Sequence, residues 1–123
     1  MDDEKLSMVE EWIDDIAMVR VTGPVDSETF GEFKEALEPL YLSERPKIIL
    51  DCERLTYINS KGIGLLAVAH RRTLMHGGQL ALFGLNPVIR QTLDLLGLAT
   101  RLHLFDDQES AVHSFASLNG APQ

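Results

Sequence analysis

A serine at the expected start of a helix is the feature of this sequence that most directly suggests chemistry. Ser60 follows a predicted strand and loop, and a long apolar segment after it predicts a helix from about Ile63 to Met75. The free N–H groups and partial positive charge at a helix start stabilise a phosphate. A hydroxyl at this place is therefore either a helix cap or an accessible phosphoacceptor, and the residues alone leave both interpretations open.

Two glycines, Gly62 and Gly64, follow in the first turn of the same predicted helix. They permit either tight packing against a sheet or close approach of a partner. Their spacing also matches a dinucleotide fingerprint, but that site needs an acidic residue about 20 positions later. No acidic residue lies between Glu53 and Asp94. The stretch from Glu53 to Ser60 is also expected to be too long for the tight strand-to-helix turn of such a site, so a nucleotide enzyme is disfavoured.

The other reactive side chains predict no catalytic, cofactor-binding or metal site. His70 and His76 are on different faces of the predicted helix, while His103 and His113 fall in separate elements, so each is expected to be a surface or packed histidine. Cys52 is the single cysteine, which excludes a disulfide framework and a cysteine-based zinc site. Because it follows a predicted buried strand, we expect it in the core.

The composition indicates one globular domain with an acidic balance. The chain has 123 residues, 45% of them hydrophobic, and a formal net charge of −8. This charge argues against non-specific nucleic-acid binding, which depends on Lys and Arg. No apolar run approaches the roughly 18 residues of a membrane span, and the acidic start Met1–Lys5 is unlike a secretory signal. We therefore expect a cytoplasmic protein without direct membrane insertion.

The charge is unevenly distributed along the chain. Residues 1–53 have a net charge of −10 and residues 94–123 a net charge of −3, whereas residues 54–93 contain five basic residues and no acidic one. One interpretation is that the middle segment is mostly buried, since acids are rarely buried without a partner. The other is that this segment presents a surface at which an added negative charge would matter.

Hydrophobic periodicity and turn residues predict the order β-β-α-β-α-β-α-β-α. Strands are expected at Leu6–Trp12, Ile16–Val21, Lys47–Cys52, Gln79–Phe83 and Leu102–Phe105, with a turn at Asp14–Asp15. Helices are expected to begin near Asp26 or Ser27, Ile63, Asn86–Pro87 and Asp106–Asp107. This alternation predicts a single α/β domain with a mainly parallel sheet, an N-terminal antiparallel hairpin and about four helices.

An ordered set of motifs resembles the STAS domain of anti-sigma-factor antagonists. The motifs are Thr22-Gly-Pro-Val-Asp26, Ile48-Ile-Leu-Asp51, Tyr57-Ile-Asn-Ser-Lys-Gly-Ile-Gly64, Gly77-Gly78 before a strand, Asn86-Pro87 and Leu95-Leu-Gly-Leu98. The resemblance covers about residues 8–118, and it implies one STAS domain over 1–123 with a short acidic N-terminus and a frayed C-terminal tail.

The resemblance implies a regulatory binding protein rather than an enzyme. Family members bind a serine kinase that is also an anti-sigma factor, the kinase phosphorylates the first Ser of the motif and ends the interaction, and a serine phosphatase restores it. The matching residue is Ser60. The family has Asp before that Ser and Ser or Thr after it, where this sequence has Asn59 and Lys61. The partner-binding residues expected from the resemblance are Asp26, Asn59, Ser60, Lys61, Gly62, Ile63 and Gly64, with no cofactor and no nucleic acid.

The resemblance also leaves a second interpretation open. Some similar proteins are accessory subunits that dock on the ATPase of an ABC transporter, or act in partner switching without a sigma factor, and neither role needs phosphorylation of Ser60. In both interpretations we expect a monomer or weak homodimer. The docking surface would include Ile63 in the first helical turn, the turn from Gly23 to Asp26 and, at its flank, Leu85–Pro87.

Overall fold

The computed structural model describes residues 5–118, so the predicted acidic start and frayed tail lie outside the described residues. Its strands are β1 (Ser7–Ile13), β2 (Ile16–Val25), β3 (Lys47–Ile58), β4 (Gln79–Phe83) and β5 (His103–Phe105). Its helices are α1 (Phe30–Tyr41), α2 (Ser60–Met75), α3 (Pro87–Leu95) and α4 (Gln108–His113), the last continued by the 3-10 turn η1 (Ser114–Leu118). The predicted order of elements is confirmed.

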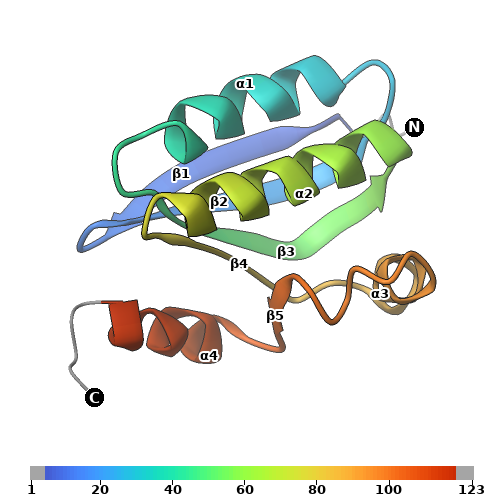
Figure 1. Ribbon diagram of the computed structural model, residues 1–123. Helices are drawn as coiled ribbons and strands as arrows, with labels where there is room; N and C mark the ends of the chain where they lie inside the picture. Colours follow the sequence, from blue (N-terminus) through green and yellow to red (C-terminus); the bar gives the residue numbers. More distant parts are fainter. Residues whose placement is uncertain (1–4, 119–123) are drawn as a thin grey trace.

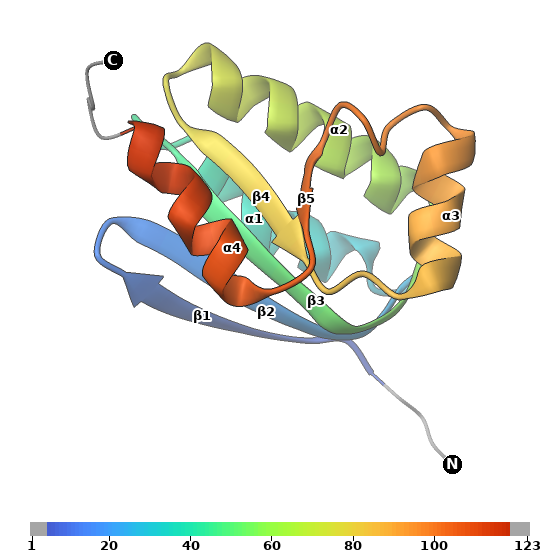
Figure 2. The same cartoon turned by 90° about the horizontal axis from the view of Figure 1, so that it is seen from below.

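The five strands form one sheet in the order β1-β2-β3-β4-β5. β1 and β2 pair antiparallel through a turn at Asp14, where φ is +54°, and the other neighbours pair parallel. Figure 1 shows α1 and α2 side by side over one face of the sheet and α4 on the opposite side, which Figure 2 presents in front. The predicted α/β fold with an N-terminal hairpin is therefore confirmed.

Side chains alternate across the sheet and form two hydrophobic cores. The core under α1 and α2 includes Val19, Leu50 and Leu66. The core under α4 includes Ile49 and Phe115. Successive residues of β3 thus enter opposite cores, as expected for a parallel strand that is covered on both faces.

β3 is longer than the sequence suggests, because Lys47–Cys52 is only the first half of it. The strand continues to Ile58, and β2 continues beside it through Gly23 and Pro24 to Val25, with two irregularities in the register. Only Asn59 separates β3 from α2. The argument that the chain approaches this helix through too long a loop for a nucleotide site was therefore wrong, whereas the missing acidic residue still disfavours one.

Candidate functional site

The ends of two paired strands bring the predicted site residues together. Val25, the last residue of β2, pairs with Ile58, the last of β3. The N–H of Asn59 donates to the carbonyl oxygen of Val25 at 2.9 Å. The residues that follow these strands, Asp26 in one segment and Asn59 and Ser60 in the other, therefore leave the sheet at one edge, where α2 begins.

Asn59 caps α2, and this decides the role of Ser60. Its Oδ1 accepts a hydrogen bond from the N–H of Gly62 at 2.9 Å, and its backbone is extended as a cap requires. Ser60 is the first residue of the helix and is exposed. Within the described residues its hydroxyl has no hydrogen-bond partner. The cap interpretation of Ser60 is therefore wrong, and its hydroxyl is open to solvent at a helix N-terminus.

Asp26 organises the turn before α1. Its Oδ1 accepts hydrogen bonds from the N–H groups of Glu28 at 3.0 Å and Thr29 at 3.1 Å. The hydroxyl of Thr29 donates to the carbonyl oxygen of Pro24 at 2.8 Å, which closes the turn. Asp26, rather than Ser27, thus binds the backbone N–H groups of the turn before α1. The regular helix begins after this turn, at Phe30, and its cap residue Thr29 makes no side-chain cap hydrogen bond.

A cation–π contact joins the N-terminal ends of the two helices. The ammonium nitrogen of Lys61 lies 5.5 Å from the centroid of the Phe30 ring. Such a contact at an exposed site contributes about 0.5–1 kcal/mol. The contact keeps the ammonium group of Lys61, the residue next to Ser60, close to the N-terminus of α1.

The three residues after Lys61 have different environments. A Cβ atom on Gly62 would lie 2.6 Å from Cγ1 of Ile58 and 3.0 Å from Cγ1 of Val25, so this glycine allows α2 to pack on the sheet. Ile63 is only 6% exposed and lies in the core. The expectation that Ile63 contributes apolar surface next to Ser60 was therefore wrong. Gly64 faces open space.

Exposed apolar side chains on the two elements that Asn59 joins, β3 and α2, come instead from residues that were not predicted to bind a partner. Tyr57 on β3 is 53% exposed and Val68 on α2 is 54% exposed. Val68 lies one helical turn after Gly64 and two after Lys61, so helical spacing from these residues was the signal that could have identified it.

The predicted flank of this site lies against β3. The side-chain amide of Asn86 donates to the carbonyl oxygen of Leu55 at 3.3 Å. Its Oδ1 accepts from the N–H of Ile89 at 2.8 Å and caps α3, with Pro87 as the first helical residue. The N-terminus of α3 is thereby fixed to the part of β3 that leads to Ser60.

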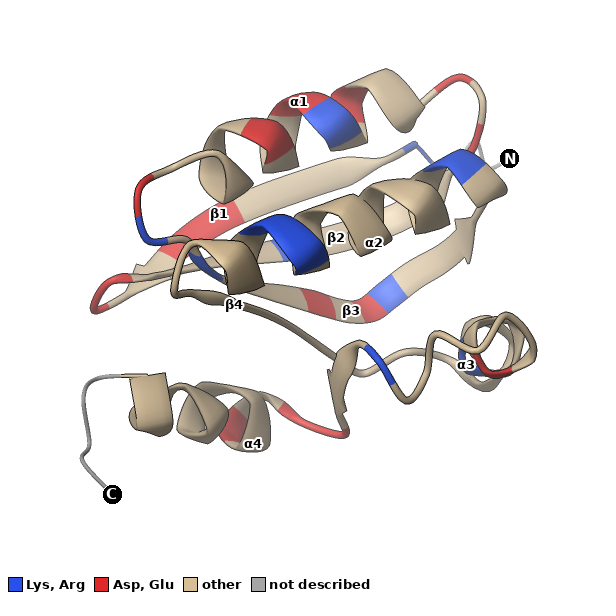
Figure 3. Cartoon of the chain, in the orientation of Figure 1, with Lys and Arg blue, Asp and Glu red and all other residues tan. Residues whose placement is uncertain are grey.

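Positive charge is exposed along α2. Figure 3 shows no acidic residue on this helix, whereas acidic residues predominate on the neighbouring α1. Of the five basic residues in the acid-free segment, Arg54, Lys61, Arg71 and Arg90 are exposed and Arg72 is half-buried. The interpretation that this segment is mostly buried does not hold for its charges, which reach the surface.

The other reactive groups differ in exposure: Cys52 is buried, His70 and His103 are half-buried, and His76 and His113 are exposed. Cys52 is buried as predicted, and burial raises the pKa of its thiol far above the ordinary value. His70 and His103 meet edge to face with their ring centroids 5.3 Å apart. Burial, with a smaller effect from His103, lowers the pKa of His70. Residues 5–118 contain no group of three or more His, Cys, Asp or Glu side chains placed to hold a metal ion.

The mainly parallel sheet and helices of this domain have counterparts among known proteins. The family model for the STAS domain matches residues 8–111, and the chain belongs to this family.

Two further comparisons agree with this family. The chain is 24% identical over 98 residues to the anti-sigma F factor antagonist of Paenibacillus polymyxa, which covers 79% of this chain and 84% of that protein. Among solved structures, an anti-sigma factor antagonist from Mycobacterium paratuberculosis aligns with a TM-score of 0.80 at 20% identity, over 89% of this chain and 93% of that one. The phosphorylated form of the Bacillus cell fate determinant SpoIIAA aligns with a TM-score of 0.65 at 21% identity, over 91% of this chain and 97% of that one.

Proposed function

We propose that this chain is an anti-sigma-factor antagonist whose binding to an anti-sigma factor that is also a serine kinase is ended by phosphorylation of Ser60. The observation that supports this most directly is the exposed hydroxyl of Ser60, which has no hydrogen-bond partner among the described residues because Asn59 caps the helix. Relatives named as antagonists of anti-sigma factors support the class of partner. A serine phosphatase would restore binding, and the protein itself would act by contact rather than by catalysis.

The proposed docking surface consists of Asp26, Asn59, Ser60, Lys61 and Gly64, extended by the exposed side chains of Tyr57 and Val68. Gly62 and Ile63 would not contact the partner directly but would pack beneath this surface, since both are buried. The surface combines an unmodified hydroxyl, apolar side chains and the positive charge of Lys61. It is therefore suited to a partner that buries an uncharged serine beneath apolar or acidic groups.

Phosphorylation would prevent such a partner from binding through the added negative charge alone. It adds about −1.5 to −2 charges to Ser60. Burying such a charge without full pairing costs several kcal/mol, and each ~1.4 kcal/mol is tenfold in affinity. Lys61 can pair with only part of the added charge. The helix N-terminus stabilises the phosphate in the free protein, so release needs no change of fold.

The test compares Ser60→Asp with Ser110→Asp against the serine kinases of the host that resemble anti-sigma factors. Ser110 is exposed and also lies in the first turn of a helix, α4, so it is a matched control. We expect Ser60→Asp to weaken binding in calorimetry about 100-fold or more, which is the effect of losing about 2.7 kcal/mol. Ser110→Asp should bind like the native chain.

Phosphate transfer is measured in the same mixtures by peptide mass. With ATP, one of these kinases should place a phosphate on Ser60 of the native chain and none on Ser60→Ala. Equal binding of Ser60→Asp and native chain would contradict the proposal, as would phosphate on another residue with Ser60 unmodified.

A second function is favoured by Lys61, which replaces the family's Ser or Thr after the phosphorylation residue. A fixed positive charge at this place suits a permanent contact with an acidic surface, such as an accessory role on the ATPase of an ABC transporter. In that case the purified ATPase would bind the native chain, no host kinase would modify Ser60, and Lys61→Glu would abolish binding.

A further inference from the structure

The outer surface of the helical layer carries opposite charges on its two helices. α1 and α2 lie side by side with their N-termini at the same end, and no other described element covers their outer side (Figure 1). α2 contains three basic residues and no acidic one, whereas α1 contains three glutamates and one lysine (Figure 3). One exposed surface is therefore divided into an acidic and a basic half.

The exposed residues of each helix form a stripe at helical spacing, on the side away from the sheet. The stripe on α2 consists of Lys61, Gly64, Val68, Arg71 and Met75. The stripe on α1 and its flanking residues includes Glu28, Gly31, Glu35 and Leu42. Met75 is 69% exposed and Leu42 49%, so both stripes end on an apolar side chain. Together the two stripes form the helical face.

Two contacts show how the helices are aligned along their length. Near their N-termini, the Lys61 ammonium lies 5.5 Å from the centroid of the Phe30 ring. Near their C-termini, burial raises the pKa of Tyr41, the Glu38 carboxylate raises it further and the Arg72 guanidinium lowers it, so both charges are close to this hydroxyl. The aligned residues are 31 positions apart in both cases. The glutamates of α1 are therefore level with the part of α2 that lies between its basic ends.

This alignment makes the helical face complementary to itself. A twofold axis parallel to the helices places α2 of each copy over α1 of the other, with direction and level preserved. Lys61 and Arg71 of one copy would then face the glutamates of the other, and Met75 would lie near Leu42. The two copies would use the same surface, as in most protein dimers. A twofold axis across the helices would instead place each helix on its own counterpart and bring like charges together, which is unfavourable.

Two exposed glycines fit a close approach at this face. Gly31 and Gly64 lie near the N-termini of α1 and α2, and a Cβ atom at either position would meet nothing within 4 Å. Glycine within a helix is destabilising relative to alanine. Packing inside the chain therefore requires neither glycine, whereas their missing side chains allow the backbone of a second copy to come near.

We propose that two copies of this chain associate through the helical face, with α2 of each copy on α1 of the other. The contact combines opposite charges with the apolar ends of the two stripes. Gly64 and Val68 also belong to the docking surface proposed above, so this dimer and the complex with an anti-sigma factor would exclude each other. That consequence rests on the proposed function, whereas the self-association does not.

The test measures molecular mass by sedimentation equilibrium, from micromolar to millimolar concentrations of the full chain. We expect the native chain to dimerise in this range. Arg71→Glu and Glu35→Arg should each weaken dimerisation about tenfold or more, because each variant places like charges opposite each other twice in the dimer. An equimolar mixture of the two variants should associate at least as strongly as the native chain, since opposite charges then meet at both contacts.

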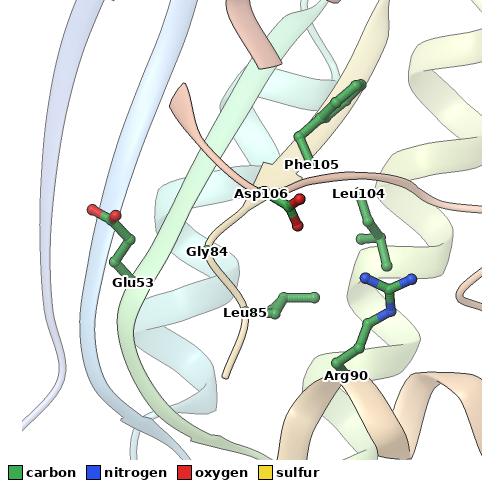
Figure 4. A pocket seen from close by; sticks show the side chains of 7 residues that line it. All are labelled: Glu53, Gly84, Leu85, Arg90, Leu104, Phe105 and Asp106. Atoms are coloured by element: carbon green, nitrogen blue, oxygen red, sulfur yellow. The ribbon is translucent and has the colours of Figure 1, made fainter. Parts of the chain in front are cut away.

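Arg90→Glu and Glu109→Arg are the matched controls, because both residues are exposed and lie outside the helical face. Arg90 is on α3 beside the cavity at the ends of β4 and β5 (Figure 4), and Glu109 is on α4 at the opposite side of the sheet. Both control variants should dimerise like the native chain.

A native chain that stays monomeric at millimolar concentration would overturn the proposal. A mixture of Arg71→Glu and Glu35→Arg that associates no better than either variant alone would also overturn it. If the native chain does not self-associate but Arg71→Glu binds an anti-sigma factor more weakly, the proposal fails and the helical face belongs to that partner. None of these measurements of self-association requires phosphorylation of Ser60.

Discussion

At the scale of single residues, the site depends on which of two adjacent polar side chains caps α2. Asn59 and Ser60 can both accept a hydrogen bond from a backbone N–H at a helix start. The structure gives the cap to Asn59 because the chain leaves β3 one residue before the helix and places Asn59 in extended conformation. Ser60 is therefore the first helical residue, and its hydroxyl remains exposed.

Replacing Asn59 with Ala should destabilise the protein by about 1 kcal/mol, since it removes the acceptor for the N–H of Gly62. Asn59→Asp keeps the acceptor and adds a negative charge at the helix N-terminus, so it should be at least as stable as the native chain. Urea unfolding followed by circular dichroism measures both. An unchanged unfolding midpoint for Asn59→Ala would show that the cap does not contribute as described.

At the scale of elements, α2 is fitted to the sheet by one of its two N-terminal glycines. Gly62 is on the side of α2 that faces the sheet, against side chains from the ends of β2 and β3, whereas Gly64 faces outward. Both look equivalent as residues of a glycine-rich motif. Their difference arises because successive helical residues are separated by about 100° around the helix axis, so only the former faces the sheet.

The substitutions Gly62→Ala and Gly64→Ala should therefore have opposite effects on stability. Alanine at 62 places a Cβ atom against Cγ1 of Ile58, and overpacking of this kind costs about 1–3 kcal/mol, more than the gain in helix propensity. Alanine at 64 has free space and should stabilise the protein by about 0.5–1 kcal/mol. Thermal unfolding of the two variants gives the comparison, and a stabilised Gly62→Ala would contradict the packing described.

At the scale of the whole molecule, α2 and β5 meet through a pair of histidines. His70 from α2 and His103 from β5 pack edge to face, and both Nδ1 atoms are buried without a hydrogen-bond partner in the described part of the chain. Burial, followed by His103, lowers the pKa of His70 below its ordinary value of 6.5. The unfolded chain therefore binds a proton at this position more readily than the folded one.

The free energy of unfolding should consequently fall as the pH drops below about 6.5, until the pH reaches the lowered pKa of folded His70. His70→Gln should make this part of the pH dependence shallower. His103→Gln should have a smaller effect, because burial, the larger cause, remains. Urea unfolding at a series of pH values measures the slope, and an identical slope in His70→Gln would contradict the assignment.

The sequence alone determined the type and order of the five strands and four helices. The buried runs Lys47–Cys52 and Gln79–Phe83 and the turn at Asp14–Asp15 are local signals, and the structure confirms all three. Local signals did not reveal that β2 and β3 continue through Pro24 and Tyr57, because this half of each strand is specified by pairing with the other.

Ser60 could be selected from the sequence because its position before an apolar helix is a local pattern. That Asn59 and not Ser60 caps α2 depends on where β3 ends and the helix begins. Tertiary structure also placed Ile63 in the core. Residue types and spacing determine which segments become helices and strands, since those preferences are local. Which side chains remain exposed depends on the faces that the elements bury against one another, and that is settled only when the whole chain packs.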